Sequence, residues 1–146
     1  MKEKKHKEES REKSPEEKQK EMQGKIMEIN MLENRLKQME QSLNFVDQQI
    51  MEQQMIQMDL DELKKAKKGN EMLFPLGKNV FVKGKLENHE VLVNIGGNIV
   101  VKQDEDKAKE AVERQKLQLS GIRDEITREV EKIINRISII EQSLRM

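Results

Sequence analysis

The sequence predicts a mainly α fold with a small β region, in which a long antiparallel α-helical coiled coil is connected by two tandem β-hairpins. Three observations predict it. Heptad-spaced apolar residues run through both ends of the 146-residue chain. A short β-branched stretch punctuated by glycine lies between them. The composition is 38% charged and 2% aromatic, which favours long helices over a compact core built on aromatic side chains.

The first helix is expected over residues 15–68. Ser14 is a suitable N-cap, Pro15 suits the first helical position, and Glu17 completes a capping box. Basic residues followed by Gly69 indicate the end of this helix. Residues 1–14 alternate Lys and Glu with nothing to bury, so a charged disordered tail is expected there. The apolar seam of the helix weakens at Gln53 and Gln57, and its members are Ile29, Leu32, Leu36, Met39, Leu43, Val46, Ile50 and Leu60.

The second helix is expected over residues 104–146, with Asp104 as its cap. Between Ile122 and Val130 two steps of four follow each other, which predicts a stutter in the supercoil, with a slight bend at Gly121. An antiparallel pairing of the helices puts Ile50 near Ser120 and Ile29 near Ile140, and lets the first helix extend beyond its partner. The expected seam consists of Ala108, Val112, Gln115, Leu119, Ile122, Ile126, Val130, Ile133, Ile137, Ile140 and Leu144.

Residues 69–103 change to strand-like patterns and contain one phrase twice, as LGKNVFV and IGGNIVV. Each copy is expected to turn a hairpin, with positive φ at Gly77 and Gly96, through the turn residues Gly77, Asn79, Gly96, Gly97 and Asn98. The strands are apolar on both faces over parts of their length, and exposed strand edges invite pairing. A β-barrel shared between several subunits is therefore predicted, assembled through Leu73, Phe74, Leu76, Val80, Phe81, Val82, Val91, Val93, Ile95, Ile99 and Val101.

Several function classes are disfavoured by composition. The formal net charge is zero, which argues against an electrostatic grip on nucleic acid. No apolar run approaches the length of a bilayer span and the N-terminus has no signal core, so no membrane partner and a cytoplasmic location are expected. His6 and His89 have no second ligand at metal spacing, so no metal site is predicted. With no Ser, His and carboxylate constellation and no phosphate loop, neither an enzyme nor a cofactor is expected.

The phrases LFPLGKNVFVKG and VLVNIGGNIVVK, set as two hairpins between two coiled-coil helices, resemble the α class of archaeal prefoldin. The resemblance covers essentially the whole chain after the first twenty or so residues. Asn79 and Asn98 stand where family members often have a second Gly, and the charged N-terminal extension is not part of the pattern. The resemblance implies a heterohexamer of two α and four β subunits, in which hairpins form a double β-barrel carrying six coiled coils. It further implies an ATP-independent holdase that captures non-native polypeptides at the coil ends and delivers them to a group II chaperonin.

Capture without ATP requires apolar surface that stays exposed at the coil ends. Met27, Met31, Ile134 and Ile139 fall off the seam, where a two-stranded coil offers no partner, and Met adapts its shape to varied clients. The remaining client-binding candidates lie on the seam, where packing within the coil explains them as well as client binding does. A further helical stripe is interpreted as docking of the helix on the barrel, and it consists of Met51, Met55 and Met58. The alternatives are a coiled-coil scaffold without client binding and a nucleic-acid binder that uses its Lys-rich tail. The full client-binding set is Met22, Ile26, Met27, Met31, Ile134, Ile137, Ile139, Ile140 and Leu144.

Overall fold

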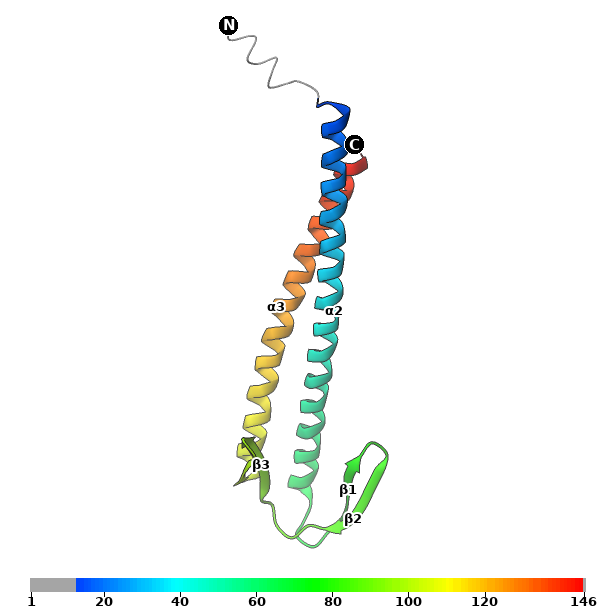
Figure 1. Ribbon diagram of the computed structural model, residues 1–146. Coiled ribbons are helices and arrows are strands. Elements are labelled where there is room, and N and C mark those ends of the chain that lie inside the picture. Colours follow the sequence, from blue (N-terminus) through cyan, green and yellow to red (C-terminus); the bar gives the residue numbers. More distant parts are fainter. Residues whose placement is uncertain (1–12, 146) are drawn as a thin grey trace. The chain divides into compact units, whose positions relative to one another are not determined.

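The computed structural model describes residues 13–145, which run helix, two hairpins, helix (Figure 1). The predicted mainly α fold with two small antiparallel hairpins is confirmed. Residues 1–12 of the predicted tail and Met146 lie outside the described residues. The chain divides into two compact units, residues 44–125 and the two chain ends on either side of them. The elements are α2 (Pro15–Lys65), β1 (Glu71–Gly77), β2 (Val80–Lys85), β3 (Val91–Gly96), β4 (Ile99–Gln103) and α3 (Glu105–Arg145).

Both helix starts carry the caps expected from the sequence. The backbone N–H of Glu17 donates to Ser14 Oγ at 3.3 Å, and that of Lys107 donates to Asp104 Oδ1 at 2.7 Å. These bonds satisfy backbone donors that lack partners inside a helix. After α2, Gly69 has a φ of 89°, and its N–H donates to the carbonyl of Leu86 at 2.7 Å. The left-handed glycine thus turns the chain from the helix into the hairpin region.

The expected seam of α2 is covered along its whole length. Val46 and Leu60 are buried, and the other apolar members from Ile29 to Ile50 are half-buried. Gln53 and Gln57 are half-buried as well, so the heptad continues through them as a polar layer. Gln57 Nε2 donates to Glu113 at 3.4 Å, and Lys116 Nζ donates to Gln57 Oε1 at 3.3 Å. The weak stretch of the seam is therefore held by side-chain hydrogen bonds between α2 and α3.

The expected seam of α3 is wrong at Gln115 and Ile122. Gln115 is exposed and Ile122 is 45% exposed. By heptad spacing, the two seam positions fall on Lys116 and Arg123 instead. The intervals between seam residues from Val112 to Leu144 then alternate between four and three residues, without the predicted stutter. Arg123 Nε donates to Asp47 Oδ1 at 2.6 Å. A long side chain can lay its apolar stem along the seam while its charged group reaches the flank. A prediction that assigns only apolar residues to the seam therefore misses such positions in this turn of α3.

Ion pairs within each unit show that the helices are antiparallel. In the unit that contains the hairpins, Asp47 pairs with Arg123 at 2.6 Å and Lys64 with Asp106 at 3.0 Å. Both pairs keep the offset expected from Ile50 opposite Ser120. In the other unit, Glu28 pairs with Arg136 at 3.0 Å, and Arg35 pairs with Glu129 at 3.3 Å.

The hairpins follow the repeated phrase but do not turn in the same way. Phe74 lies opposite Val82 in the first hairpin, and Val93 lies opposite Val101 in the second. In the second hairpin both central residues have positive φ, 59° at Gly97 and 61° at Asn98, as a type I′ turn requires.

Gly77 does not adopt the positive φ predicted for it. It ends β1 opposite Val80, and the first turn uses Asn79, whose φ is 69°. The two copies differ because Lys78 stands where the second copy has Gly97. A side chain with a Cβ disfavours the left-handed region, so this turn has one left-handed central residue instead of two.

The corrected seam predicts different effects for two isoleucines of α3. Ile133 is 4% exposed, and Ile133→Ala should lower the free energy of unfolding by about 2–5 kcal/mol because it leaves a cavity between the helices. The matched change Ile122→Ala removes the same atoms from a half-exposed site and should cost less than about 1 kcal/mol. Urea unfolding of the full chain, followed by circular dichroism, measures both. Equal losses would contradict the seam described above.

Candidate functional site

One face of each hairpin packs on the helices. Met72 and Phe74 of β1 are half-buried and line a hollow with Ile56 and Leu60 of α2. The ring of Phe74 lies over Gly84, where an added Cβ would come within 2.7 Å of the ring. A glycine is needed at this close approach.

The second hairpin packs in the same way. Val91 and Val93 of β3 line a hollow with Leu60 of α2 and with Ala108 and Val112 of α3. Val101 lies opposite Val93 on the paired strand and is half-buried too. Predicted assembly residues Phe74, Val91, Val93 and Val101 are thus partly covered within the chain.

The remaining apolar residues of the hairpins are exposed. Leu92 and Val100 belong to this set although the sequence analysis did not select them. Alternation along the strand places Leu92 on the face opposite Val91 and Val93, but it does not say which of the two faces the helices cover. An exposed apolar face of this extent marks an interaction surface. We call it the exposed hairpin surface, and it consists of Leu73, Leu76, Val80, Phe81, Val82, Leu92, Ile95, Ile99 and Val100.

A second exposed apolar surface lies where the start of α2 and the end of α3 run side by side (Figure 1). Met31 is 71% exposed, and the other off-seam residues predicted to bind clients are at least half exposed. By contrast Ile140 is 3% exposed, so it packs in the seam, while Ile137 and Leu144 are half-buried. We call the exposed members the coil-end surface, namely Met22, Ile26, Met27, Met31, Ile134 and Ile139.

Met22 lies in a stretch of α2 that α3 does not cover. Every residue from Pro15 to Gly24 is exposed, as expected if the first helix extends beyond its partner. Met22 therefore has no seam to fill in this chain, although its heptad position is compatible with one. Ile26 is also exposed, so coil packing does not account for either residue.

Two apolar residues of the coil end project away from the flank that carries the ion pairs. The ion pairs Glu28–Arg136 and Arg35–Glu129 use residues seven apart on each helix, which places both pairs on one flank. Ile134 precedes Arg136 by two residues, about 200° around the helix, and therefore projects away from that flank. Ile26 stands in the same relation to Glu28. The ion pairs thus hold the two helices together without covering these apolar side chains.

Other exposed apolar residues lie on the helices of the hairpin-containing unit. Met51, Met55 and Met58 are exposed, and Met55 lines a hollow with Leu76 and Phe81 of the first hairpin. Docking of α2 on the hairpin region thus accounts for Met55. Phe45 and Leu117 are exposed too and were not selected from the sequence.

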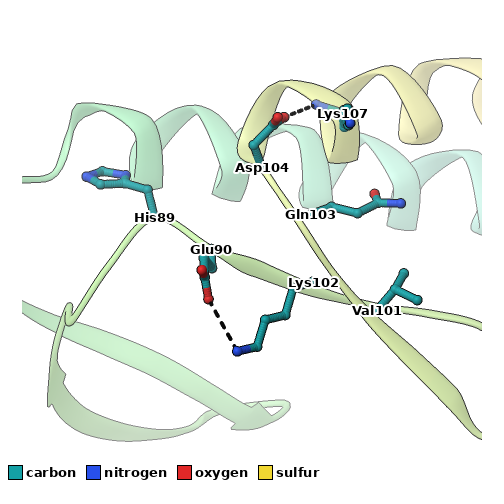
Figure 2. A pocket seen from close by; sticks show the side chains of 7 residues that line it. All are labelled: His89, Glu90, Val101, Lys102, Gln103, Asp104 and Lys107. Carbon is teal, nitrogen blue, oxygen red and sulfur yellow. Dashed lines mark hydrogen bonds and ion pairs between the residues drawn. The ribbon is translucent and has the colours of Figure 1, made fainter.

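A polar hollow of about 630 Å³ lies where β4 leads into α3 (Figure 2). Glu90 pairs with Lys102 at 3.8 Å and the backbone N–H of Lys107 donates to Asp104, whereas the buried Oε1 of Gln103 has no hydrogen-bond partner among the described residues. His89 also lines the hollow, and its Nδ1 lies 2.5 Å from Oε1 of the buried Glu105. These contacts fasten the linker between the hairpins to the start of α3. Within residues 13–145 no cluster of His, Cys, Asp or Glu is arranged to hold a metal ion, and neither helix has a long enough apolar stretch to cross a membrane.

One ion pair between the helices shifts the pKa of both partners. Lys109 Nζ donates to Asp61 Oδ1 at 2.8 Å. This hydrogen bond lowers the pKa of Asp61 and raises the pKa of Lys109. The stabilisation from Asp61 is present above the carboxyl's ordinary pKa and is lost as the pH falls through the lowered value. That from Lys109 is present below the amine's ordinary pKa and is lost as the pH rises through the raised one, so the pair acts across the neutral range.

Comparisons with known proteins agree on one family. A family model described as Prefoldin subunit matches residues 32–146. Prefoldin subunit alpha of Methanobrevibacter smithii is 33% identical over 109 residues, which are 74% of each chain. Prefoldin subunit alpha of Thermofilum pendens is 32% identical over 87 residues, 59% of this chain and 67% of the relative. A cryo-EM structure of filamentous PFD from Methanocaldococcus jannaschii has the same fold, with a TM-score of 0.50 and 20% identity, and covers 83% of this chain and 95% of that one.

The Asp61–Lys109 pair predicts a pH-dependent contribution to stability. Asp61→Asn should lower Tm slightly at pH 7, and the difference from the unchanged chain should vanish at a pH low enough to protonate the paired carboxyl. The effect should be small and should shrink in high salt, because both side chains are partly exposed. Thermal unfolding across pH measures it, with Asp59→Asn as the control on the same helix. An equal pH profile for the two variants would contradict a specific role of the pair.

Proposed function

This chain belongs to the prefoldin family as an α-type subunit of the archaeal kind, and from that premise we propose that it is an ATP-independent holdase subunit. Family membership gives it a chaperone-type role in protein folding. In the proposed mechanism its coil-end surface captures non-native polypeptides, and its hairpins join other prefoldin subunits. A cytoplasmic location, delivery of clients to a group II chaperonin and the absence of catalysis belong to the same proposal.

The observation that carries client capture is the contrast between adjacent isoleucines of α3. Ile133 and Ile140 are nearly fully buried in the seam, whereas Ile134 and Ile139 are about half exposed. Covering an exposed side chain of this size stabilises a complex by about 1–2 kcal/mol, from roughly 25 cal/mol per Å² of apolar area. One such contact is weak, but several coil ends in one assembly would add their contacts on the same client. Because apolar burial is non-directional, this arrangement suits polypeptides of varied sequence.

Assembly through the hairpins is supported by the exposed hairpin surface. A single two-stranded hairpin is marginally stable in water, and the two hairpins within residues 13–145 form separate two-stranded sheets. Leu73, Phe81 and Leu92 are each more than half exposed, and the strand edges are open to pairing. We propose that two α and four β subunits bury these residues in a shared double β-barrel. The β subunits then supply the strands that complete each sheet.

Replacing the off-seam residues of the coil-end surface should abolish capture. The variant Met27→Ser, Met31→Ser, Ile134→Ser, Ile139→Ser removes apolar side chains that the helices do not cover, so the assembly should form normally. Its suppression of the aggregation of an unfolded test protein, measured without ATP after co-expression with a β subunit, should fall to background. A matched control is Phe45→Ser, Met51→Ser, Met58→Ser, Leu117→Ser, which removes equally exposed apolar residues elsewhere and should retain activity.

Unchanged suppression by the coil-end variant would refute the assignment of the client surface. If the unaltered assembly itself fails to suppress aggregation, a scaffold without client binding becomes the better account. Adding ATP should not change the suppression of aggregation by either variant, because the proposed capture depends only on apolar burial.

Polar substitutions on the exposed hairpin surface should block assembly and leave the helices intact. Leu73→Ser, Phe81→Ser, Leu92→Ser removes apolar area that the proposed barrel buries, and native mass measurement with a β subunit should detect no hexamer. The control is Lys83→Ser, Lys102→Ser, whose residues lie directly opposite Leu73 and Leu92 on the paired strands. This control should assemble normally. A hexamer formed by the variant Leu73→Ser, Phe81→Ser, Leu92→Ser would contradict the proposed interface. Loss of the hexamer in the lysine control would contradict it too.

A further inference from the structure

The methionines of this chain are unevenly distributed between its helices. The chain has ten Met and no Cys, so thioethers are its only sulfur groups. No Met occurs in α3, where the coil-end surface is made of Ile134 and Ile139. The α2 half of that surface instead contains Met22, Met27 and Met31, all at least half exposed. One half of the coil-end surface can therefore be oxidised and the other half cannot.

Oxidation of an exposed methionine changes its chemistry without breaking the chain. A peroxide transfers one oxygen atom to the thioether sulfur, so that an S–O bond forms, the O–O bond breaks and water or an alcohol leaves. The sulfur gives up two electrons and the peroxide takes them. The product is a polar, chiral sulfoxide in place of a flexible apolar group. A dithiol-dependent sulfoxide reductase reverses the step, with oxidation of two thiols to a disulfide and release of water.

The residues that hold the fold are largely protected from this reaction. The seam consists mostly of Ile, Leu and Val, and its one methionine in α2, Met39, is half-buried. The exposed hairpin surface contains no methionine, and Met72 is half-buried against α2. Mild peroxide should therefore reach the coil-end surface while the helix pair and the hairpins keep their apolar contacts, apart from that of the exposed Met55 with the first hairpin.

We propose that Met22, Met27 and Met31 form an oxidant-responsive modification site that controls client binding. Peroxide converts them to sulfoxides and weakens capture, and a sulfoxide reductase restores it. The inference rests on the proposed holdase function, since it assigns a regulation to the same surface. Because Ile26, Ile134 and Ile139 do not react, oxidation weakens the surface rather than removing it.

The chain supplies its own matched control in the methionines of the other unit. Met51, Met55 and Met58 lie on the same helix and are exposed to a similar extent. They should oxidise as readily as the coil-end methionines, but they do not belong to the proposed client surface. Leucine keeps the apolar character and approximate volume of methionine and has no thioether. Replacing either group by leucine thus separates the effect of oxidation from the effect of lost apolar area.

The experiment compares three full-length chains, each assembled with the same β subunit. They are the unaltered chain, the variant M22L/M27L/M31L and the variant M51L/M55L/M58L. Each assembly is treated with hydrogen peroxide, which is then removed with catalase, and sulfoxide formation at each Met is read by peptide mass spectrometry. Native mass and circular dichroism record assembly and helix content. Suppression of aggregation is measured before treatment, after it, and after incubation with a sulfoxide reductase and dithiol.

After peroxide treatment, the assembly with the unaltered chain should be needed at about tenfold higher concentration for half-maximal suppression of aggregation, because three of its apolar contacts become polar. M51L/M55L/M58L should lose activity to the same extent, whereas M22L/M27L/M31L should keep it, and the reductase should restore the loss. The inference is overturned if M22L/M27L/M31L loses as much activity as the unaltered chain, or if the unaltered chain keeps full activity with all three sulfoxides formed. A lack of suppression before any treatment would instead overturn the proposed holdase function.

Discussion

The structure depends on the burial of a single apolar seam between two helices. Two helices in contact cover only the residues at heptad positions, and this chain fills those positions with Ile, Leu and Val, as at Ile133 and Ile140. At the coil end, no further layer of the described residues covers the opposite sides of the helices. An apolar side chain one position off the seam therefore stays exposed, and Ile134 and Ile139 are examples. The same constraint that holds the helices together leaves the coil-end surface open.

The hairpins obey a related constraint, because each has only one face that the helices can cover. Residues such as Phe74 and Val93 pack inward, and their neighbours Leu73 and Leu92 remain exposed. The chain has very few aromatic residues with which to build a core around these strands. Both exposed surfaces thus have one physical origin, an apolar content greater than a helix pair and two hairpins can bury. The proposed function assigns one surface to stable partners and the other to transient clients.

Polar contacts set the relative positions of the helices where the seam is weak. Gln57 takes a seam position and exchanges hydrogen bonds with Glu113 and Lys116, while Asp47 and Asp61 pair with basic residues of α3. Exposed ion pairs add little stability each. Their value here lies in register, because a shift along the helices would separate every pair at once. In the other unit, the pairs Glu28–Arg136 and Arg35–Glu129 keep the start of α2 beside the end of α3, where the coil-end surface is formed.

The sequence by itself determined the helix caps, the heptad of α2, the two hairpins and the off-seam residues of the coil ends. These features are local, since caps, turns and periodicity depend on residues within a few positions of one another. Only the tertiary structure decided that Arg123 reaches α2 through its ion pair with Asp47 while Ile122 stays about half exposed. It also decided that Phe74 and Val93 pack inward while Leu92 and Val100 stay exposed. Strands that are apolar on both faces do not reveal which face the helices will cover.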